Sequence, residues 1–169
     1  LAWDLCNEPF SYGNMKNDHV EPLVRSEYAW LEAQHAHCKE LGASAPITIG
    51  AHWGTPIDMI EPMCDLLSIH PYWTFDTDKE GYESHLDADV SFAKQVGKPL
   101  LSTETCWGHL DDAKRVETIR YTLEQHAERG IGWLVYLLHH SLIADAHRPE
   151  FGRVGGPMNL AFIEADGSL

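Results

Sequence analysis

The sequence predicts an α/β fold built on a parallel β-sheet. Short runs rich in Leu, Ile, Val and Thr alternate with longer stretches in which apolar residues recur every three or four positions. Such alternation of strand and helix favours a parallel sheet with right-handed crossovers, in either a doubly wound or a barrel arrangement. The 169 residues are enough for one ordinary domain.

Five segments are expected to be strands because they are short and rich in β-forming residues: residues 1–7, 47–52, 66–70, 100–104 and 132–137. Three amphipathic helices are expected between them. The first runs from about Pro22 to Gly42, with its apolar face formed by Val24, Tyr28, Leu31, His35 and Cys38. The second covers about 82–96, and segment 56–64 has room for one short helix at most.

The third helix has clear start and stop signals. Asp111 is placed to cap its first turn, and Gly130 is placed to end it. Four apolar residues between them, Val116, Ile119, Leu123 and Ala127, are expected to form its buried stripe.

The number of elements predicts an incomplete barrel. A closed (β/α)8 TIM barrel usually needs about 250 residues, whereas this chain supplies five strands and three good helices. The chain starts inside a strand without an initiating Met, and the tail at 158–163 ends before an eighth helix could form. We therefore expect residues 1–169 to be the C-terminal portion of one barrel domain, strands four to eight, with the remainder N-terminal to Leu1.

Charge and composition exclude several classes of partner. The net charge of −14, with no basic cluster, argues against nucleic acid or an anionic membrane surface and favours a neutral ligand. No apolar run approaches the roughly eighteen residues that span a bilayer, and no signal-peptide pattern is present. A soluble protein is expected, either secreted or cytoplasmic. The four cysteines lack CxxC spacing, so they predict neither a zinc site nor a disulfide framework.

Two glutamates end two of the expected strands. Glu8 lies at the end of the first strand, and Glu104 at the end of the fourth. Strands that end in carboxylates present acids at the rim of a sheet, and two such acids are the groups that break a glycosidic bond. Each glutamate alone would more often be a solvated end-of-strand residue, so the prediction depends on the pair.

Three motifs carry a family resemblance: residues 3–9 (Trp-Asp-Leu-Cys-Asn-Glu-Pro), 68–73 (Ser-Ile-His-Pro-Tyr-Trp) and 101–108 (Leu-Ser-Thr-Glu-Thr-Cys-Trp-Gly). In this order they resemble strands four, six and seven of clan A glycoside hydrolases, the superfamily that includes glycoside hydrolase family 5. The resemblance implies a cellulase-like retaining enzyme without a cofactor, with Glu8 as acid/base and Glu104 as nucleophile. The two carboxyl groups would then lie roughly 5 to 5.5 Å apart.

The resemblance also implies substrate-binding residues. Asn7 would hydrogen-bond the sugar's 2-hydroxyl, Tyr72 would donate to the nucleophile, and His70 would contact the sugar. Trp107 is the best candidate for stacking on a pyranose ring, and Trp53 and Trp73 also follow strand ends, where aromatic faces can stack on sugars. His52 ends the second strand and is expected to face the same pocket.

Local chemistry at the first motif gives two further predictions. Side chains alternate along a strand, so a bulge or twist is expected if Asn7 and Glu8 are to serve one site. Pro9 disfavours the helical region for the preceding residue and is expected to hold Glu8 extended.

Two alternative functions remain. A metal-dependent barrel hydrolase or isomerase would use His52, His70, His139 and a carboxylate, but no HxH or HxxxH motif supports it. A non-catalytic carbohydrate-binding relative would keep the aromatic cleft, yet it has no use for two converging, mutually repelling carboxylates.

The chain departs from the family pattern at one place: the tryptophan that many members of the clan carry at strand eight is absent from segment 136–140. The expected partner is a β-linked oligo- or polysaccharide; its sugar, and endo or exo cleavage, stay open.

Overall fold

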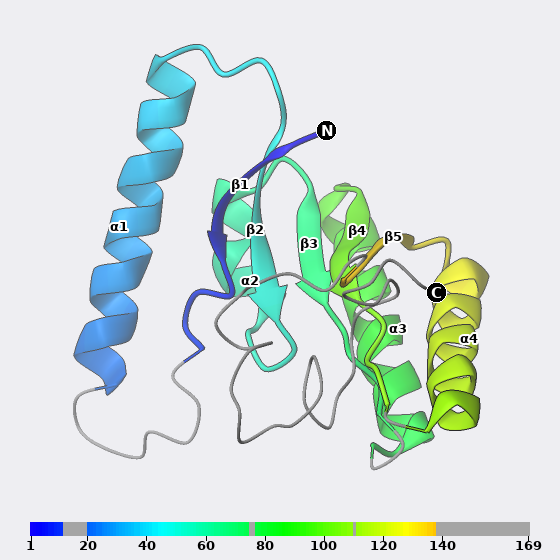
Figure 1. Ribbon diagram of the computed structural model, residues 1–169. Helices are drawn as coiled ribbons and strands as arrows, with labels where there is room; N and C mark the ends of the chain where they lie inside the picture. Colours follow the sequence, from blue (N-terminus) through cyan, green and yellow to red (C-terminus); the bar gives the residue numbers. More distant parts are fainter. Residues whose placement is uncertain (12–19, 75–76, 110, 138–169) are drawn as a thin grey trace, which may run out of the picture. The chain divides into compact units, whose positions relative to one another are not determined.

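The computed structural model describes residues 1–11, 20–74, 77–109 and 111–137 (Figure 1). Strands and helices alternate along them as predicted: β1 (Trp3–Asn7), α1 (Val20–Glu40), β2 (Ile47–His52), α2 (Ile57–Ile60), the 3-10 helix η1 (Glu61–Met63), β3 (Leu67–His70), α3 (Lys79–Val96), β4 (Leu100–Thr105), α4 (Asp112–Arg129) and β5 (Gly132–Val135). None of these helices combines the length and the apolar character needed to cross a membrane.

The five strands follow one another in the sheet in the order in which they occur along the chain. β1 pairs with β2, and β2 with β3, in parallel register. A doubly wound sheet would reverse its strand order at a switch point, whereas a barrel adds each strand beside the last. The fold is therefore part of a (β/α)8 barrel, as the sequence predicts.

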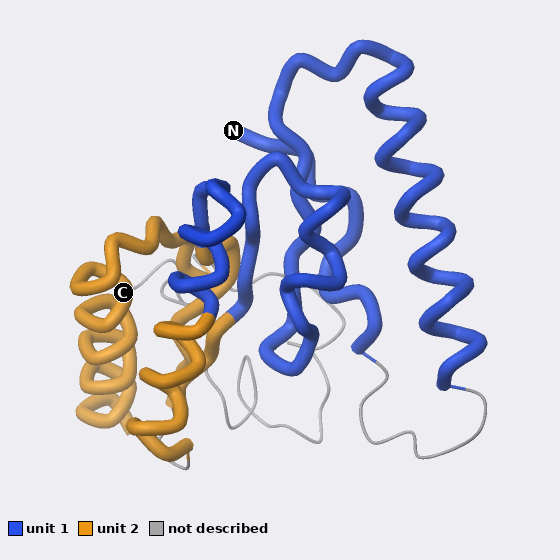
Figure 2. Tube along the Cα trace, turned by 180° about the vertical axis from the view of Figure 1, so that it is seen from behind, with its two compact units in different colours: residues 1–70, 89–101 blue, residues 71–88, 102–169 orange. Residues whose placement is uncertain are grey.

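Two compact units divide the chain (Figure 2). Unit 1 comprises residues 1–70 and 89–101, and unit 2 comprises residues 71–88 and 102–169. The boundary falls directly after β3 and passes through α3 and β4.

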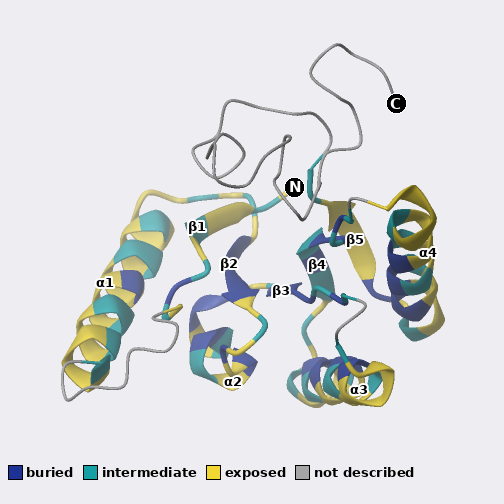
Figure 3. Ribbon diagram, turned by 60° about the horizontal axis from the view of Figure 1, so that its bottom comes forward, coloured by how far each residue is buried: buried dark blue, intermediate teal, exposed yellow. Residues whose placement is uncertain are grey.

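The core of unit 1 forms around β2 and β3, which are almost wholly buried (Figure 3). Its fully buried apolar side chains include Leu31, Ile47, Ile49, Ile60 and Leu67. Leu31 comes from α1, and the other four residues of the predicted apolar face of α1 are each half-buried. That predicted face is confirmed. In contrast, most of β1 is exposed.

The core of unit 2 is aromatic. Trp73 is 2% exposed and packs against Tyr121, with ring centroids 4.6 Å apart. The ammonium group of Lys79 lies 5.1 Å from the centroid of Trp73 and 4.5 Å from that of Tyr121, within range of a cation–π interaction. Tyr82 is also fully buried. The segment that follows β3 is thereby anchored to α3 and α4.

The ends of α4 match the prediction, but its buried face does not. Asp111 accepts a hydrogen bond from the Lys114 backbone N–H at 3.1 Å, and Gly130 ends the helix with φ +67°. However, Val116 is 51% exposed and Ala127 is exposed. The buried residues of α4 are Thr118, Thr122, Gln125 and His126.

The buried polar face of α4 has a physical reason. Thr118 Oγ1 donates to the Lys114 carbonyl at 2.9 Å, and His126 Nδ1 hydrogen-bonds the Thr122 carbonyl at 2.7 Å. Burying a polar group costs little once it is hydrogen-bonded. An apolar periodicity cannot reveal such bonds. The predicted stripe is wrong at Val116 and Ala127, whereas Ile119 and Leu123 are half-buried.

Candidate active site

A β-bulge precedes Glu8. Trp3 and Asp4 of β1 lie opposite Ile47 and Thr48 of β2, but Asn7 lies opposite Gly50. Three steps along β1 therefore match two steps along β2, and the extra residue breaks the alternation of side chains. The irregularity predicted beside Asn7 and Glu8 is confirmed.

The backbone of Glu8 differs from the prediction. Its φ is +49°, in the left-handed region, and its N–H donates to the Gly50 carbonyl at 2.9 Å. The proline ring at Pro9 penalises right-handed helical geometry in the preceding residue, but that restriction does not force an extended backbone. The expectation that Glu8 is extended is wrong, since the chain turns after the bulge while keeping one hydrogen bond to β2.

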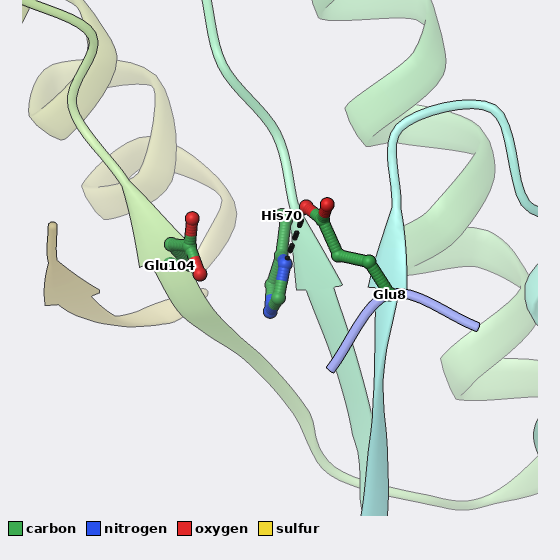
Figure 4. A group of neighbouring side chains, drawn as sticks. All are labelled: Glu8, His70 and Glu104. Carbon is green, nitrogen blue, oxygen red and sulfur yellow. Dashed lines mark hydrogen bonds and ion pairs between the residues drawn. The ribbon is translucent and has the colours of Figure 1, made fainter. Parts of the chain in front are cut away.

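Glu8 is hydrogen-bonded to a buried histidine. His70 Nδ1 lies 2.9 Å from Glu8 Oε1, and the side chains of His70 and Glu8 are 2% and 26% exposed (Figure 4). This bond lowers the pKa of Glu8, since it stabilises the carboxylate and outweighs the opposing effect of partial burial. A smaller contribution in the same direction comes from the charge of His52. Sequence reasoning missed this contact, because it assigned His70 to the sugar.

Glu104 is hydrogen-bonded to a tyrosine in unit 2. Tyr72 Oη donates to Glu104 Oε1 at 2.6 Å, as the resemblance implies. The Tyr72 ring meets the edge of Trp107, with centroids 5.1 Å apart and an interplanar angle of 75°. On one side of Tyr72, the Pro71 carbonyl accepts a 2.7 Å bond from Thr105 Oγ1. On the other side, Trp73 is buried, so the backbone around Tyr72 is fixed at both flanks.

The two bonding partners of the glutamates are neighbours in sequence. His70 is the last residue of β3, and Tyr72 follows with one residue between them. Glu8 is therefore bonded to the last residue of β3, and Glu104 to a residue just after that strand. The separation of their two carboxyl groups stays a prediction, because Glu8 belongs to unit 1 and Glu104 to unit 2.

The remaining candidates differ in accessibility. Asn7 and His52 are exposed, and His52 Nδ1 accepts a 3.2 Å bond from the Gly54 backbone N–H. Trp53 and Trp107 are half-buried. Their roles in binding substrate stay predictions. Trp73 is different, because burial against Tyr121 leaves no face for a sugar, so its predicted stacking role is wrong.

Two of the histidines in the metal-site hypothesis, His52 and His70, make hydrogen bonds within the protein. The imidazole of His70 is hydrogen-bonded to Glu8, and that of His52 accepts a bond from its own loop. His139, the third histidine of that hypothesis, lies outside the described residues. The hypothesis of a metal site therefore stays a prediction.

Comparisons with known proteins identify the fold. No family model matches the chain, and no curated protein matches it. A β-glucuronidase of Bacteroides uniformis aligns with 90% of this chain and 20% of its own length, with TM-score 0.65 and 14% identity. A Ruminococcus gnavus β-glucuronidase in complex with D-glucuronic acid aligns with 99% of this chain and 30% of its own length, with TM-score 0.62 and 16% identity.

A third similar structure is an active-site mutant of a Rhizomucor miehei β-1,3-glucanosyltransferase in complex with laminaritriose. It aligns with 83% of this chain and 53% of its own length, with TM-score 0.53 and 16% identity. At such identities the similarity shows the fold alone, which is that of glycoside hydrolase-like barrels. The chain spans from a fifth to about half of the length of these three structures.

Proposed function

We propose that this chain is part of a retaining glycoside hydrolase that cleaves β-glycosidic bonds, with Glu104 as nucleophile and Glu8 as acid/base. The observation that supports it is that each glutamate is held by a side-chain hydrogen bond, Glu8 by His70 and Glu104 by Tyr72. Two carboxylates with different polar partners can take different roles at one bond.

In the first step, Glu104 attacks the anomeric carbon. Tyr72 holds Oε1 of Glu104 by a 2.6 Å bond, which orients the carboxylate for the attack. Glu8 gives a proton to the departing oxygen as the glycosidic bond breaks. A glycosyl-enzyme ester on Glu104 results.

In the second step, Glu8 takes a proton from water as the water oxygen attacks the anomeric carbon. The ester bond to Glu104 then breaks, which releases the sugar and regenerates the Glu104 carboxylate. The bond from His70 favours the ionised form of Glu8, which suits this step. In the first step the negative charge of a nearby Glu104 would instead favour the protonated form of Glu8, because like charges disfavour ionisation. Esterification of Glu104 removes that charge, so Glu8 changes its protonation state as the reaction requires.

The substrate we propose is a β-linked carbohydrate. The solved structures with similar folds include proteins bound to D-glucuronic acid and to laminaritriose, which makes a sugar the natural ligand class. Trp107 and Trp53 would stack on its rings, while Asn7 and His52 would bind its hydroxyl groups. The chain's net charge of −14 favours a neutral sugar over a polyanion.

The complete site needs more than these residues. We propose that the remainder of the barrel, N-terminal to Leu1, completes the domain, consistent with the 20% to 53% of similar structures that the chain spans. The isolated 169 residues are then expected to be inactive and poorly stable, because an open barrel exposes two strand edges. Glycosidase activity measured from this piece alone would contradict that expectation.

The test replaces each glutamate in the full-length protein and adds azide. Glu104→Ala is expected to abolish turnover and, with azide, to give the α-glycosyl azide. Glu8→Ala is expected to give the β-azide from a substrate with a good leaving group. Glu83→Ala is the matched control, because Glu83 also accepts a 2.6 Å bond from a tyrosine, Tyr121. Full activity of both active-site variants would refute the proposal and favour the metal enzyme. A wild-type protein that binds the sugar without cleaving it would favour the non-catalytic relative.

A further inference from the structure

Asp4 spans the bulge that precedes Glu8. Its Oδ1 accepts two backbone hydrogen bonds, from Gly50 of β2 at 3.1 Å and from Cys6 of β1 at 3.2 Å. A bulge disrupts the regular ladder, so N–H groups beside it need other acceptors. One carboxylate oxygen supplies both bonds and ties the two strands together where their register shifts between Asp4 and Asn7.

The other oxygen of Asp4 faces His70. A Cβ built on Gly50 would lie 2.7 Å from His70 Nε2 and 3.0 Å from Asp4 Oδ2, so both atoms border the same small space above Gly50. The opposite ring nitrogen, Nδ1, is the one bonded to Glu8. The imidazole of His70 therefore lies between the carboxylate of Asp4 in β1 and that of Glu8, which follows β1, and it borders Gly50.

The carboxyl group of Asp4 is enclosed by these contacts, although the residue as a whole is exposed. Its partial burial raises the pKa of Asp4, and the bonds from Gly50 and Cys6 oppose that rise. A carboxylate that accepts two backbone bonds has a fixed orientation. It can therefore fix the orientation of the ring that it faces.

We propose that Asp4 is a positioning residue for the acid/base Glu8: it holds the bulge through Oδ1 and orients the His70 imidazole through Oδ2. Gly50 belongs to the same arrangement, since any side chain there would displace the ring. This inference rests on the proposed function of Glu8. It adds residues that do not touch the substrate but decide where the acid points.

Loss of the positioning role of Asp4 should impair only the step in which Glu8 acts as an acid. Substrates with poor leaving groups need a proton from Glu8, whereas those with good leaving groups depart without it. Misplacing Glu8 should therefore slow the first class far more than the second. Loss of folded protein would slow both equally, so the ratio of the two rates separates positioning from stability.

The experiment compares phenyl and dinitrophenyl β-glycosides of glucose and glucuronic acid as probes, in the full-length protein. Asp4→Ala is expected to lower kcat/KM for the phenyl glycoside on the order of 100-fold, and for the dinitrophenyl glycoside less than about 10-fold. Asp4→Asn keeps an oxygen for the two backbone bonds, so its kcat/KM for the phenyl glycoside should lie between those of wild type and Asp4→Ala.

Two controls accompany these variants. Asp65→Asn also changes an aspartate that binds the β2 backbone, through Ile47 N–H at 2.9 Å, and should leave the rate ratio unchanged. Gly50→Ala should reproduce the selective loss, whereas Gly54→Ala, whose Cβ would meet nothing closer than 3.7 Å, should not.

The outcomes distinguish this inference from the proposed function. If Glu8→Ala shows the selective loss and the Asp4 and Gly50 variants slow both substrates equally, the positioning role is refuted while the function stands. If Glu8→Ala itself loses no activity, the proposed function has failed first.

Discussion

The hydroxyl of Tyr72 donates a 2.6 Å hydrogen bond to Oε1 of Glu104. The two residues are remote in sequence, and both belong to unit 2. Hydrogen bonds of this length to a carboxylate are among the stronger ones in proteins, and they fix the orientation of the acceptor.

Removing this hydroxyl should slow catalysis. In Tyr72→Phe the carboxylate of Glu104 loses a bond worth about 1.5 to 3 kcal/mol, so kcat/KM should fall roughly 10- to 150-fold. Steady-state kinetics on an aryl glycoside measure the loss. Tyr121→Phe is the matched control, since Tyr121 makes an equally short bond to Glu83. Equal kinetics of Tyr72→Phe and wild type would contradict a role for the bond.

The His70 contact should be visible in the titration of Glu8. His70→Ala removes the main cause of the lowered pKa, so the pKa of Glu8 should rise. Carbon NMR of the labelled glutamate carboxyl groups measures it directly. His52→Ala should move the pKa of Glu8 in the same direction by less, because the charge of His52 is the smaller cause. A Glu8 pKa that stays constant or falls in His70→Ala would contradict this account.

Two tryptophans should behave differently on substitution. Trp107 is half-buried beside Tyr72, and Trp107→Ala is expected to raise KM through loss of sugar stacking. Trp73→Ala is expected to destabilise the fold by about 3 to 5 kcal/mol, because Trp73 is buried against Tyr121. Denaturant unfolding and KM values test both. A raised KM with unchanged stability in Trp73→Ala would show instead that Trp73 binds the sugar.

A buried carboxyl group should make stability depend on pH. Burial raises the pKa of Asp89 to about 7, so in the folded protein the neutral form is favoured at lower pH. The unfolded chain ionises at its ordinary pKa of about 4; stability is therefore lost as pH rises from there to about 7, and stays lost above it. Asp89→Asn should raise the free energy of unfolding by on the order of 1 to 4 kcal/mol at pH 8, and by little at pH 4.

Thermal unfolding at the two pH values measures that difference. Asp87→Asn is the control, since Asp87 is exposed and accepts a 2.7 Å hydrogen bond from Arg129 Nε. Asp87→Asn should lower the free energy of unfolding by less than about 1 kcal/mol, and it should give no gain in stability at high pH. A stabilisation by Asp89→Asn that is equal at pH 4 and pH 8 would assign the effect to packing instead of charge.

Local signals predicted most of the elements. Strand composition located β1 to β5 within a few residues, and cap residues located the ends of α4 at Asp111 and Gly130. The bulge at Asn7 followed from the need to bring two adjacent side chains to one site. These features depend on neighbouring residues, so they can be inferred from a single sequence.

Two predictions were wrong, the buried face of α4 and the role of Trp73, because both depended on side-chain contacts that a periodic pattern does not show. The buried face of α4 is polar, and its Thr118 Oγ1 and His126 Nδ1 each bond to a backbone carbonyl one turn earlier. Trp73 is a core residue and not a sugar platform, because Tyr121 and Lys79 cover it. Periodicity along one helix or strand carries no information about which side chains from other elements will cover it.

The sequence by itself determined the strand and helix order, the barrel-like class and the two glutamates, because motif and periodicity are written along the chain. Only the tertiary structure decided how each acid is held: His70 and Asp4 converge beside Gly50, and the backbone of Glu8 turns to φ +49°. The physical reason is that hydrogen bonds between strands depend on register. Register is fixed by packing of whole elements and not by any residue alone.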